Sequence, residues 1–234
     1  MGHFSPKLTT EGAGRSGRLL GDETRFLKTL FENPRLTGAV APSGRALARA
    51  MARPVDPSGA GLVVELGPGT GPVTRALIER GVARERLVLV EYDAGFCRLL
   101  GQRFAPVKVV HGDAYDLPRT LASILGQPVA AIVSSLPLLN QPADRRAKLI
   151  ADAFALMAPG GLFVQFTYGV ASPIPREVCA GRLSAHCTPP IWRNLPPARV
   201  WTYRADPHGD FVEPVIARIH RGANRLVRAC TPPK

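Results

Sequence analysis

Two acids and three glycines are the residues of this chain best placed to form a binding site. Glu65 lies in an apolar run and is followed on alternate positions by Gly67, Gly69 and Gly71. The run predicts a buried strand, and the glycines predict a tight turn into a helix, because glycine lets backbone turn sharply and approach a ligand closely. A second apolar run ends in Glu91, twenty residues past the last glycine. An acid in that place, facing a glycine turn on the neighbouring strand, holds a ribose by its hydroxyls.

The same residues argue against a dinucleotide. The turn reads Gly-Pro-Gly-Thr-Gly, and no Gly-x-Gly-x-x-Gly pattern runs on into the helix. The charge of Glu65 would also meet a pyrophosphate just before the turn. An acid with glycines suits a ligand that carries a cationic amino-acid end.

The elements that must position these residues alternate between strand and helix from residue 60 onwards. Such alternation with short connections predicts a parallel sheet with helices on both faces, whose ligands lie outside the carboxyl ends of the strands. Strands are predicted at 61–66, 87–91, 106–110, 129–134 and 161–168. Helices are predicted at 72–80, 94–104, 118–126 and 143–158, followed by a short one near 176–184. An antiparallel pair at 187–193 and 198–204 would close the sheet.

Composition indicates an anionic partner. The chain has 234 residues and a net charge of +12, from 30 Lys and Arg against 18 Asp and Glu, which favours nucleic acid or an acidic membrane surface. Its four cysteines lack the spacing of metal ligands and predict reduced thiols, and we expect no secretory leader. The uncharged span 120–143 is interrupted by polar residues and prolines, so we expect no transmembrane segment. These features predict a cytoplasmic protein whose membrane contact is peripheral.

The two ends of the chain leave alternatives open. Residues 1–18 are predicted to be disordered, and 19–54 to form amphipathic helices. Those helices either cap a core or lie on a membrane, apolar side down. The basic tail, 205–234, is either a membrane-surface helix or a solvated extension. The domain between them would span 55–204.

The glycine turn resembles motif I of the class I S-adenosylmethionine (SAM)-dependent methyltransferases, which reads E-x-G-x-G-x-G. Glu65 and the three glycines match it position for position. The resemblance implies a Rossmann-like fold with a seven-stranded, mostly parallel sheet, and SAM as the cofactor. Gly112-Asp113-Ala114 matches a further motif of this superfamily, in which the aspartate accepts from the adenine amino group. Beyond the motif I residues, the resemblance implies a cofactor site that includes Glu91, Tyr92, Gly112, Asp113, Ala114 and Ser134.

The stretch after the fourth predicted strand discriminates best between substrates. Methyltransferases that act on amino groups carry N/D-P-P-Y or N-L-P-Y there, with an aromatic that stacks on a flipped base. Here Ser135-Leu136-Pro137-Leu138 puts serine in place of the amide and Leu138 in place of the aromatic. A nucleobase would lose a stacking platform that contributes ~1–3 kcal/mol. An apolar wall of Leu136, Pro137 and Leu138 suits an acyl or glycerol region better.

Over residues 24–204 the chain resembles the small bacterial phospholipid N-methyltransferases, which convert phosphatidylethanolamine to phosphatidylcholine. The resemblance rests on Asn33-Pro34-Arg35, on 38–43, on the SAM motifs, on Ser135-Leu136-Pro137-Leu138-Leu139 and on 189–204. It implies a phospholipid substrate at the inner face of the cell membrane, with no metal. Tyr168 and Ser135 are the candidates for holding the amine, and Arg35 and Arg193 for the lipid phosphate. The related rRNA adenine dimethyltransferases, which keep the aromatic, are the alternative, although its absence here disfavours nucleic acid. The sequence leaves the oligomeric state open.

Overall fold

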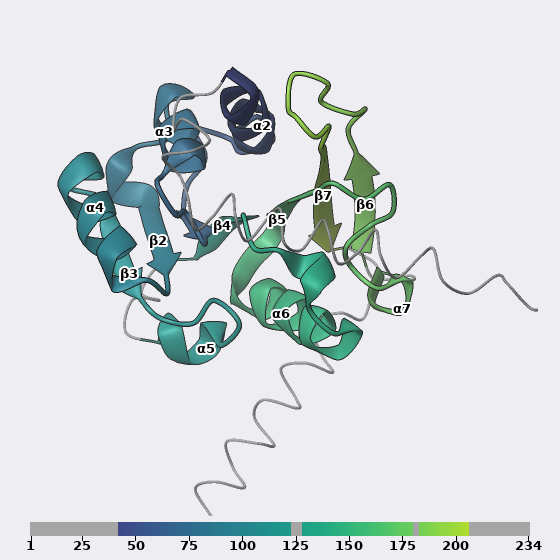
Figure 1. Ribbon diagram of the computed structural model, residues 1–234. Coiled ribbons are helices and arrows are strands. Elements are labelled where there is room, and N and C mark those ends of the chain that lie inside the picture. Colours follow the sequence, from purple (N-terminus) through teal and green to yellow (C-terminus); the bar gives the residue numbers. More distant parts are fainter. Residues whose placement is uncertain (1–41, 123–127, 180–182, 206–234) are drawn as a thin grey trace, which may run out of the picture. The chain divides into compact units, whose positions relative to one another are not determined.

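A seven-stranded sheet organises the part of the chain that the structure, a computed structural model, describes: residues 42–122, 128–179 and 183–205 (Figure 1). The strand order is β3-β2-β1-β4-β5-β7-β6. The first five strands are parallel: β1 (Leu62–Leu66), β2 (Leu87–Glu91), β3 (Lys108–His111), β4 (Val129–Ser134) and β5 (Met157–Thr167). The last two, β6 (Leu183–Cys187) and β7 (Arg199–Ala205), are antiparallel to their neighbours. The predicted fold class is confirmed.

Helices cover both faces of the sheet. On one face, α2 (Pro42–Ala52), α3 (Pro72–Glu79) and α4 (Ala94–Phe104) contribute buried side chains to one core cluster. On the other, α5 (Leu117–Thr120), α6 (Ala143–Leu156) and α7 (Arg176–Cys179) pack into a second cluster. Every residue of β1 and β2 is buried, as expected of strands covered on both faces. Two short 3-10 turns, η1 (Arg84–Arg86) and η2 (Leu138–Asn140), complete the described elements.

Register places the functional loops together. Leu66 pairs with Val90 on one side and with Ser134 on the other, so the carboxyl ends of β2, β1 and β4 lie at one edge of the sheet. The strand order reverses between β1 and β4, since β2 and β3 lie on one side of β1 and β4 and β5 on the other. A ligand crevice is expected outside this point.

The apolar face of α2 is buried. Leu47, Ala48, Met51 and Ala52 are each at most 8% exposed and lie in the first core cluster. For residues 42–52 this face therefore packs within the protein and is not available to a bilayer. The rest of the helical extension, the disordered segment expected at 1–18 and residues 206–234 of the tail lie outside the described residues. Within those residues, no helix combines the length and hydropathy that crossing a membrane requires.

The predicted antiparallel pair is wrong in its first member. The sixth strand runs from Leu183 to Cys187 instead of 187–193, so residues 183 and 184 of the predicted helix are strand. The preceding helix is described over Arg176–Cys179, and 180–182 lie outside the described residues. Pro189 and Pro190 cannot donate ladder hydrogen bonds, which excludes them from a regular strand at this position. Residues 188–198 instead form a loop, which we call the β6–β7 loop, closed by a single bridge between Ile191 and Ala198. Helix α5 is described only over four residues, and 123–126 of the predicted 118–126 helix lie outside the described residues.

Candidate active site

The glycine turn has the backbone that the sequence predicts. Gly67 and Gly71 adopt φ of 65° and 83°, in the left-handed region that favours glycine. A Cβ on Gly67 would lie 3.0 Å from Leu136 Cδ2, so the absent side chain leaves room at the crevice. A Cβ on Gly71 would lie 2.3 Å from the ring of Phe104 in α4. Gly71 therefore lets α3 begin close against α4, and its role in the turn is to allow this packing.

Glu91 is the centre of a hydrogen-bond network at the end of β2. Its Oε2 accepts from the backbone N–H of Gly69 at 3.0 Å, while Oε1 accepts from Tyr92 N at 2.9 Å and Asp93 N at 3.0 Å. The carboxylate is 8% exposed and lines the pocket described below. Three charge-assisted bonds fix its position, and a carboxylate offers about four acceptor sites, so acceptor capacity remains for a ligand hydroxyl.

Glu65, by contrast, has an incomplete set of partners. It is fully buried in β1, and its Oε2 accepts from the Thr74 hydroxyl at 2.6 Å. Its Oε1 is buried without a partner. Burial raises the pKa of Glu65 to about 8, and the nearby charge of Glu91 adds to the rise, against the opposing hydrogen bond from Thr74. A buried orphan acceptor of this kind is costly unless something near it compensates.

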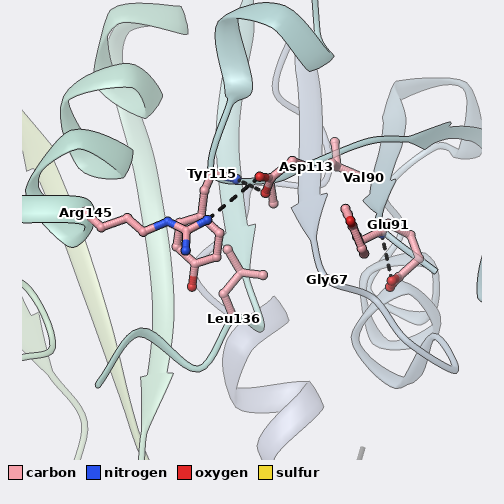
Figure 2. A pocket seen from close by; sticks show the side chains of 9 residues that line it. Gly67, Val90, Glu91, Asp113, Tyr115, Leu136 and Arg145 are labelled. Carbon is pink, nitrogen blue, oxygen red and sulfur yellow. Dashed lines mark hydrogen bonds and ion pairs between the residues drawn. The ribbon is translucent and has the colours of Figure 1, made fainter. Parts of the chain in front are cut away.

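A pocket of about 320 Å³ lies between the ends of β1, β2, β3 and β4, within the size range of small-molecule sites (Figure 2). The sequence predicted six of its nine lining residues, and the structure adds three. The six are Gly67, Glu91, Tyr92, Asp113, Ala114 and Leu136, and the three are Val90, Tyr115 and Arg145.

Arg145 and Tyr115 form a cluster with Asp113 that sequence reasoning missed. Arg145 extends from α6 with its guanidinium 4.3 Å from the centroid of the Tyr115 ring and 3.8 Å from Asp113 Oδ2 (Figure 2). The other oxygen of Asp113 accepts from the Tyr115 N–H at 2.8 Å. Burial raises the pKa of Tyr115 to about 12, so its phenol is neutral at pH 7. The signal was weak: Arg145 lies thirty residues after Tyr115, and a cation near the start of a helix is usually solvated.

Five of the predicted cofactor residues do not line the pocket: Glu65, Gly69 and Gly71, described above, and Gly112 and Ser134. Gly112 donates its N–H to the Glu91 carbonyl at 3.0 Å, and a Cβ there would lie 2.5 Å from Thr120. Ser134 is fully buried, and its Oγ accepts from Leu136 N at 3.4 Å. Both therefore support the loops that carry the pocket residues.

The acceptor stretch divides into exposed and buried positions. Leu136 lines the pocket, and Ser135 and Pro137 are partly buried. Leu138, which the sequence placed in the substrate wall, is 2% exposed and belongs to the second core cluster. That prediction is corrected, because the turn of η2 points this side chain into the core. Sequence reasoning also missed Gln165, whose Nε2 donates to the carbonyls of Leu136 at 2.9 Å and Phe166 at 2.8 Å.

The other substrate candidates are spread out. Tyr168 follows β5, is partly buried and packs edge-on against Phe166, with ring centroids 5.5 Å apart. Burial raises the pKa of Tyr168, while a side-chain hydrogen bond with Asn194 opposes the shift. Arg193 is exposed in the β6–β7 loop. Neither residue lines the pocket, and Arg35 lies outside the described residues.

The donors and acceptors of the pocket fit the expected cofactor. The Glu91 carboxylate suits a ribose, and the Asp113 carboxylate suits an exocyclic amine. Glu65 is fully buried and does not line the pocket, and a positive charge bound near it would favour its ionised form. Among the residues that the structure describes, no group of three or more His, Cys, Asp or Glu side chains could hold a metal ion.

Comparison with known proteins agrees with this fit. A family model described as a methyltransferase domain matches residues 63–161. The ornithine lipid N-methyltransferase of Singulisphaera acidiphila is 34% identical over 145 residues, covering 61% of this chain and 76% of that protein. The ribosomal RNA small subunit methyltransferase A of Kineococcus radiotolerans is 30% identical over 169 residues. That match covers 63% of this chain and 53% of the relative, so the chain spans about half its length.

The fold also matches solved structures. The glycopeptide N-methyltransferase MtfA, solved in complex with SAM, superposes with a TM-score of 0.54 at 15% identity. The match covers 70% of this chain and 95% of MtfA. At this level of identity the likeness extends to the fold.

Proposed function

Because this chain belongs to the class I SAM-dependent methyltransferases, we propose that it methylates the primary amine of a membrane lipid, with phosphatidylethanolamine as the substrate and phosphatidylcholine as the end product. SAM supplies an activated methyl group. The observation that carries the proposal is the 34% identity to an ornithine lipid N-methyltransferase over 76% of that protein. Phosphatidylethanolamine and ornithine lipids both present an amine on a membrane-bound molecule.

The geometry of the site supports an amine acceptor held beside the pocket. Methyl transfer from a sulfonium is an in-line displacement, so positioning provides most of the catalysis. Glu91 and Asp113 would hold the nucleoside. Because Leu136 lines the pocket, the backbone of Ser135–Pro137 lies at the edge of the pocket. Gln165 fixes this backbone by donating to the Leu136 carbonyl.

Tyr168 is proposed to hold the amine as a neutral phenol. Its pKa is raised by burial, so at neutral pH it keeps its proton and can accept one hydrogen bond while donating another. A phenol in this state is a poor base. The ammonium proton would therefore leave to water, with the Ser135 hydroxyl as a hydrogen-bond partner of the amine, and a nearby sulfonium charge would favour that loss.

RNA adenine methylation is the second candidate. It is favoured by the 30% identity to a ribosomal RNA methyltransferase and by the net charge of +12. Against it stands the leucine at position 138, which is buried where the related enzymes carry an aromatic.

The test is an assay with methyl-labelled SAM and three acceptors in parallel: phosphatidylethanolamine vesicles, ornithine lipid vesicles and ribosomal RNA. We expect label in the organic phase with the first acceptor. Label with ornithine lipid alone would keep the lipid class and change the headgroup. Label in RNA and none in either lipid would overturn the proposal, provided that calorimetry shows intact binding of S-adenosylhomocysteine.

A further inference from the structure

Exposed apolar side chains lie together near the carboxyl ends of the parallel strands. Six large apolar residues are exposed among those that the structure describes, and of these only Leu99 lies within an α-helix. Tyr92 lies at the pocket. The other four lie on three loops near the carboxyl end of β5: Leu139 (39% exposed), Val170 (84%), Trp192 (76%) and Leu195 (82%). Such a concentration is unusual for a surface in contact only with water.

Contacts between the loops place these residues on one surface. Cδ1 of Leu139 lies 3.0 Å from the point where a Cβ on Gly169 would stand, directly beside Val170. The side chain of Tyr168, on the same loop as Val170, is hydrogen-bonded to Asn194 of the β6–β7 loop. Thr167, at the end of β5, pairs with Arg199, at the start of the antiparallel strand β7, so the β6–β7 loop also lies at the carboxyl end of β5 (Figure 1). We call the loops that carry Leu139, Val170, Trp192 and Leu195 the docking loops.

The β6–β7 loop holds its apolar residues outward. Asn194 is 4% exposed, its Nδ2 donates to the Pro196 carbonyl at 2.7 Å and its backbone N–H donates to the Ile191 carbonyl at 3.0 Å. Trp192 and Leu195, on either side of it, are consequently displayed to solvent by an anchored backbone. An exposed apolar surface of this kind indicates a binding partner.

The charged residues of the docking loops indicate what this partner is. The segments 135–142, 168–175 and 188–198, which form the docking loops, contain one arginine, Arg193, and no acid. Arg193 is exposed and lies next to Trp192. Apolar and aromatic tips beside an arginine match the interface of an anionic bilayer, in which tryptophan lies at headgroup level and guanidinium groups meet phosphates.

We propose that the docking loops seat the protein on an anionic phospholipid bilayer, with Trp192 and Leu195 inserted at headgroup depth. The inference rests on the proposed function and deepens it. The loops lie at the same edge of the sheet as the pocket, since β1, β2, β4 and β5 all end there. A lipid amine would therefore reach the crevice from the membrane while its acyl chains stay in the bilayer.

Tryptophan fluorescence of the full-length chain tests this seating directly. The chain has two tryptophans, so Trp201→Phe leaves Trp192 as the sole reporter. Vesicles of phosphatidylcholine with about a quarter phosphatidylglycerol should shift its emission to the blue, and brominated acyl chains should quench it. Added salt should reverse the shift. An unshifted, unquenched Trp192 on vesicles that sediment with the protein would overturn the proposal. Should Trp201→Phe not fold, the difference between wild type and Trp192→Phe gives the same reading.

Vesicle co-sedimentation gives an independent reading. Trp192→Ser combined with Leu195→Ser should weaken partition roughly 100- to 10,000-fold, because each of the two large apolar side chains that no longer inserts accounts for about 10- to 100-fold. Leu99→Ser is the matched control, because Leu99 is exposed on α4 at the other end of the sheet, and it should partition as wild type. Equal losses in both variants, or a loss of RNA binding with unchanged vesicle binding, would overturn the proposal.

Turnover separates this proposal from the proposed function. On vesicles the double variant should lose activity, while with monomeric short-chain phosphatidylethanolamine the loss should be at least tenfold smaller. Lipid methylation by wild type without quenching of Trp192 would refute the role of the docking loops and support the proposed activity. Quenching of Trp192 without methylation of any lipid would support the docking loops and refute the proposed substrate.

Discussion

Replacing Glu91 tests the cofactor site most directly. This carboxylate accepts three backbone N–H bonds, from Gly69, Tyr92 and Asp93, and it also faces the pocket. In Glu91→Gln an amide NH₂ takes the place of one oxygen. On the Oε2 side it meets the Gly69 N–H, and on the Oε1 side it meets two N–H groups. Donor faces donor in either case, so the glycine turn must shift.

The magnitude follows from the bonds that are lost. A hydrogen bond to a charged group contributes ~1.5–3 kcal/mol, and ribose hydroxyls meet a neutral, displaced group in the variant. We therefore expect the affinity for S-adenosylhomocysteine to fall about 10- to 100-fold. The unpaired N–H of the turn should in addition lower the free energy of unfolding by ~1–3 kcal/mol.

Calorimetric titration with S-adenosylhomocysteine measures the first effect, and urea unfolding the second. Glu79→Gln is the matched control, since it removes one glutamate charge from an exposed site in α3 that pairs with Arg49 at 3.9 Å. It should change affinity less than twofold. An affinity of Glu91→Gln within twofold of wild type, in folded protein, would refute the assignment of Glu91 to the ribose.

Three further substitutions test other parts of the argument. Gly71→Ala should destabilise by roughly 2–5 kcal/mol in urea unfolding, from strain at positive φ and the clash with Phe104, and Phe104→Leu should recover part of this; a loss under ~1 kcal/mol would contradict it. Gln165→Leu should lower kcat with affinity for S-adenosylhomocysteine unchanged, because the Leu136 carbonyl loses its donor, and equal kcat would remove Gln165 as a positioning residue. Glu65→Gln should melt at a higher temperature than wild type, by a margin that grows from pH 5 to pH 8. The pKa of Glu65 is about 8 in the folded protein against 4.5 for a free glutamate, so wild type loses stability as the pH rises through that window. A difference in melting temperature that stays constant with pH would contradict this reasoning.

The sequence predicted the parallel half of the sheet well, because each of its strands contains a short apolar run, and β1 and β2 are buried along their whole length. Glu91 ends β2 and glycines follow β1 and β3, and the observed bounds agree within a few residues, apart from the start of β5. The sixth strand was misplaced because it carries no such run. Of its five residues only Leu183 is buried, and the middle three are exposed, so no apolar alternation marks it.

The site was predictable where a motif fixes backbone, and less so where side chains meet across the fold. Glu91 ends β2 and Asp113 lies two residues after β3, so their positions follow from the topology of the sheet. Arg145 reaches the pocket from a distant helix, and nothing local connects it to Tyr115. The leucines after Ser135 look equivalent in sequence, yet Leu136 lines the pocket and Leu138 is buried, because a short 3-10 turn decides which one faces the core.

The electrostatics of the crevice also explain why motif I carries an acid. Glu65 and Glu91 lie on adjacent strands, and neither forms an ion pair within the described part of the chain. Glu91 is compensated by three N–H groups, whereas Glu65 has one hydroxyl and an orphan oxygen, and its pKa rises accordingly. At pH 7 Glu65 is therefore largely protonated, and a pyrophosphate bound nearby would oppose its ionisation further. A sulfonium with an ammonium group would instead lower the pKa of Glu65 and favour its charged form, so an activated methyl donor suits this pair of acids better than a dinucleotide does.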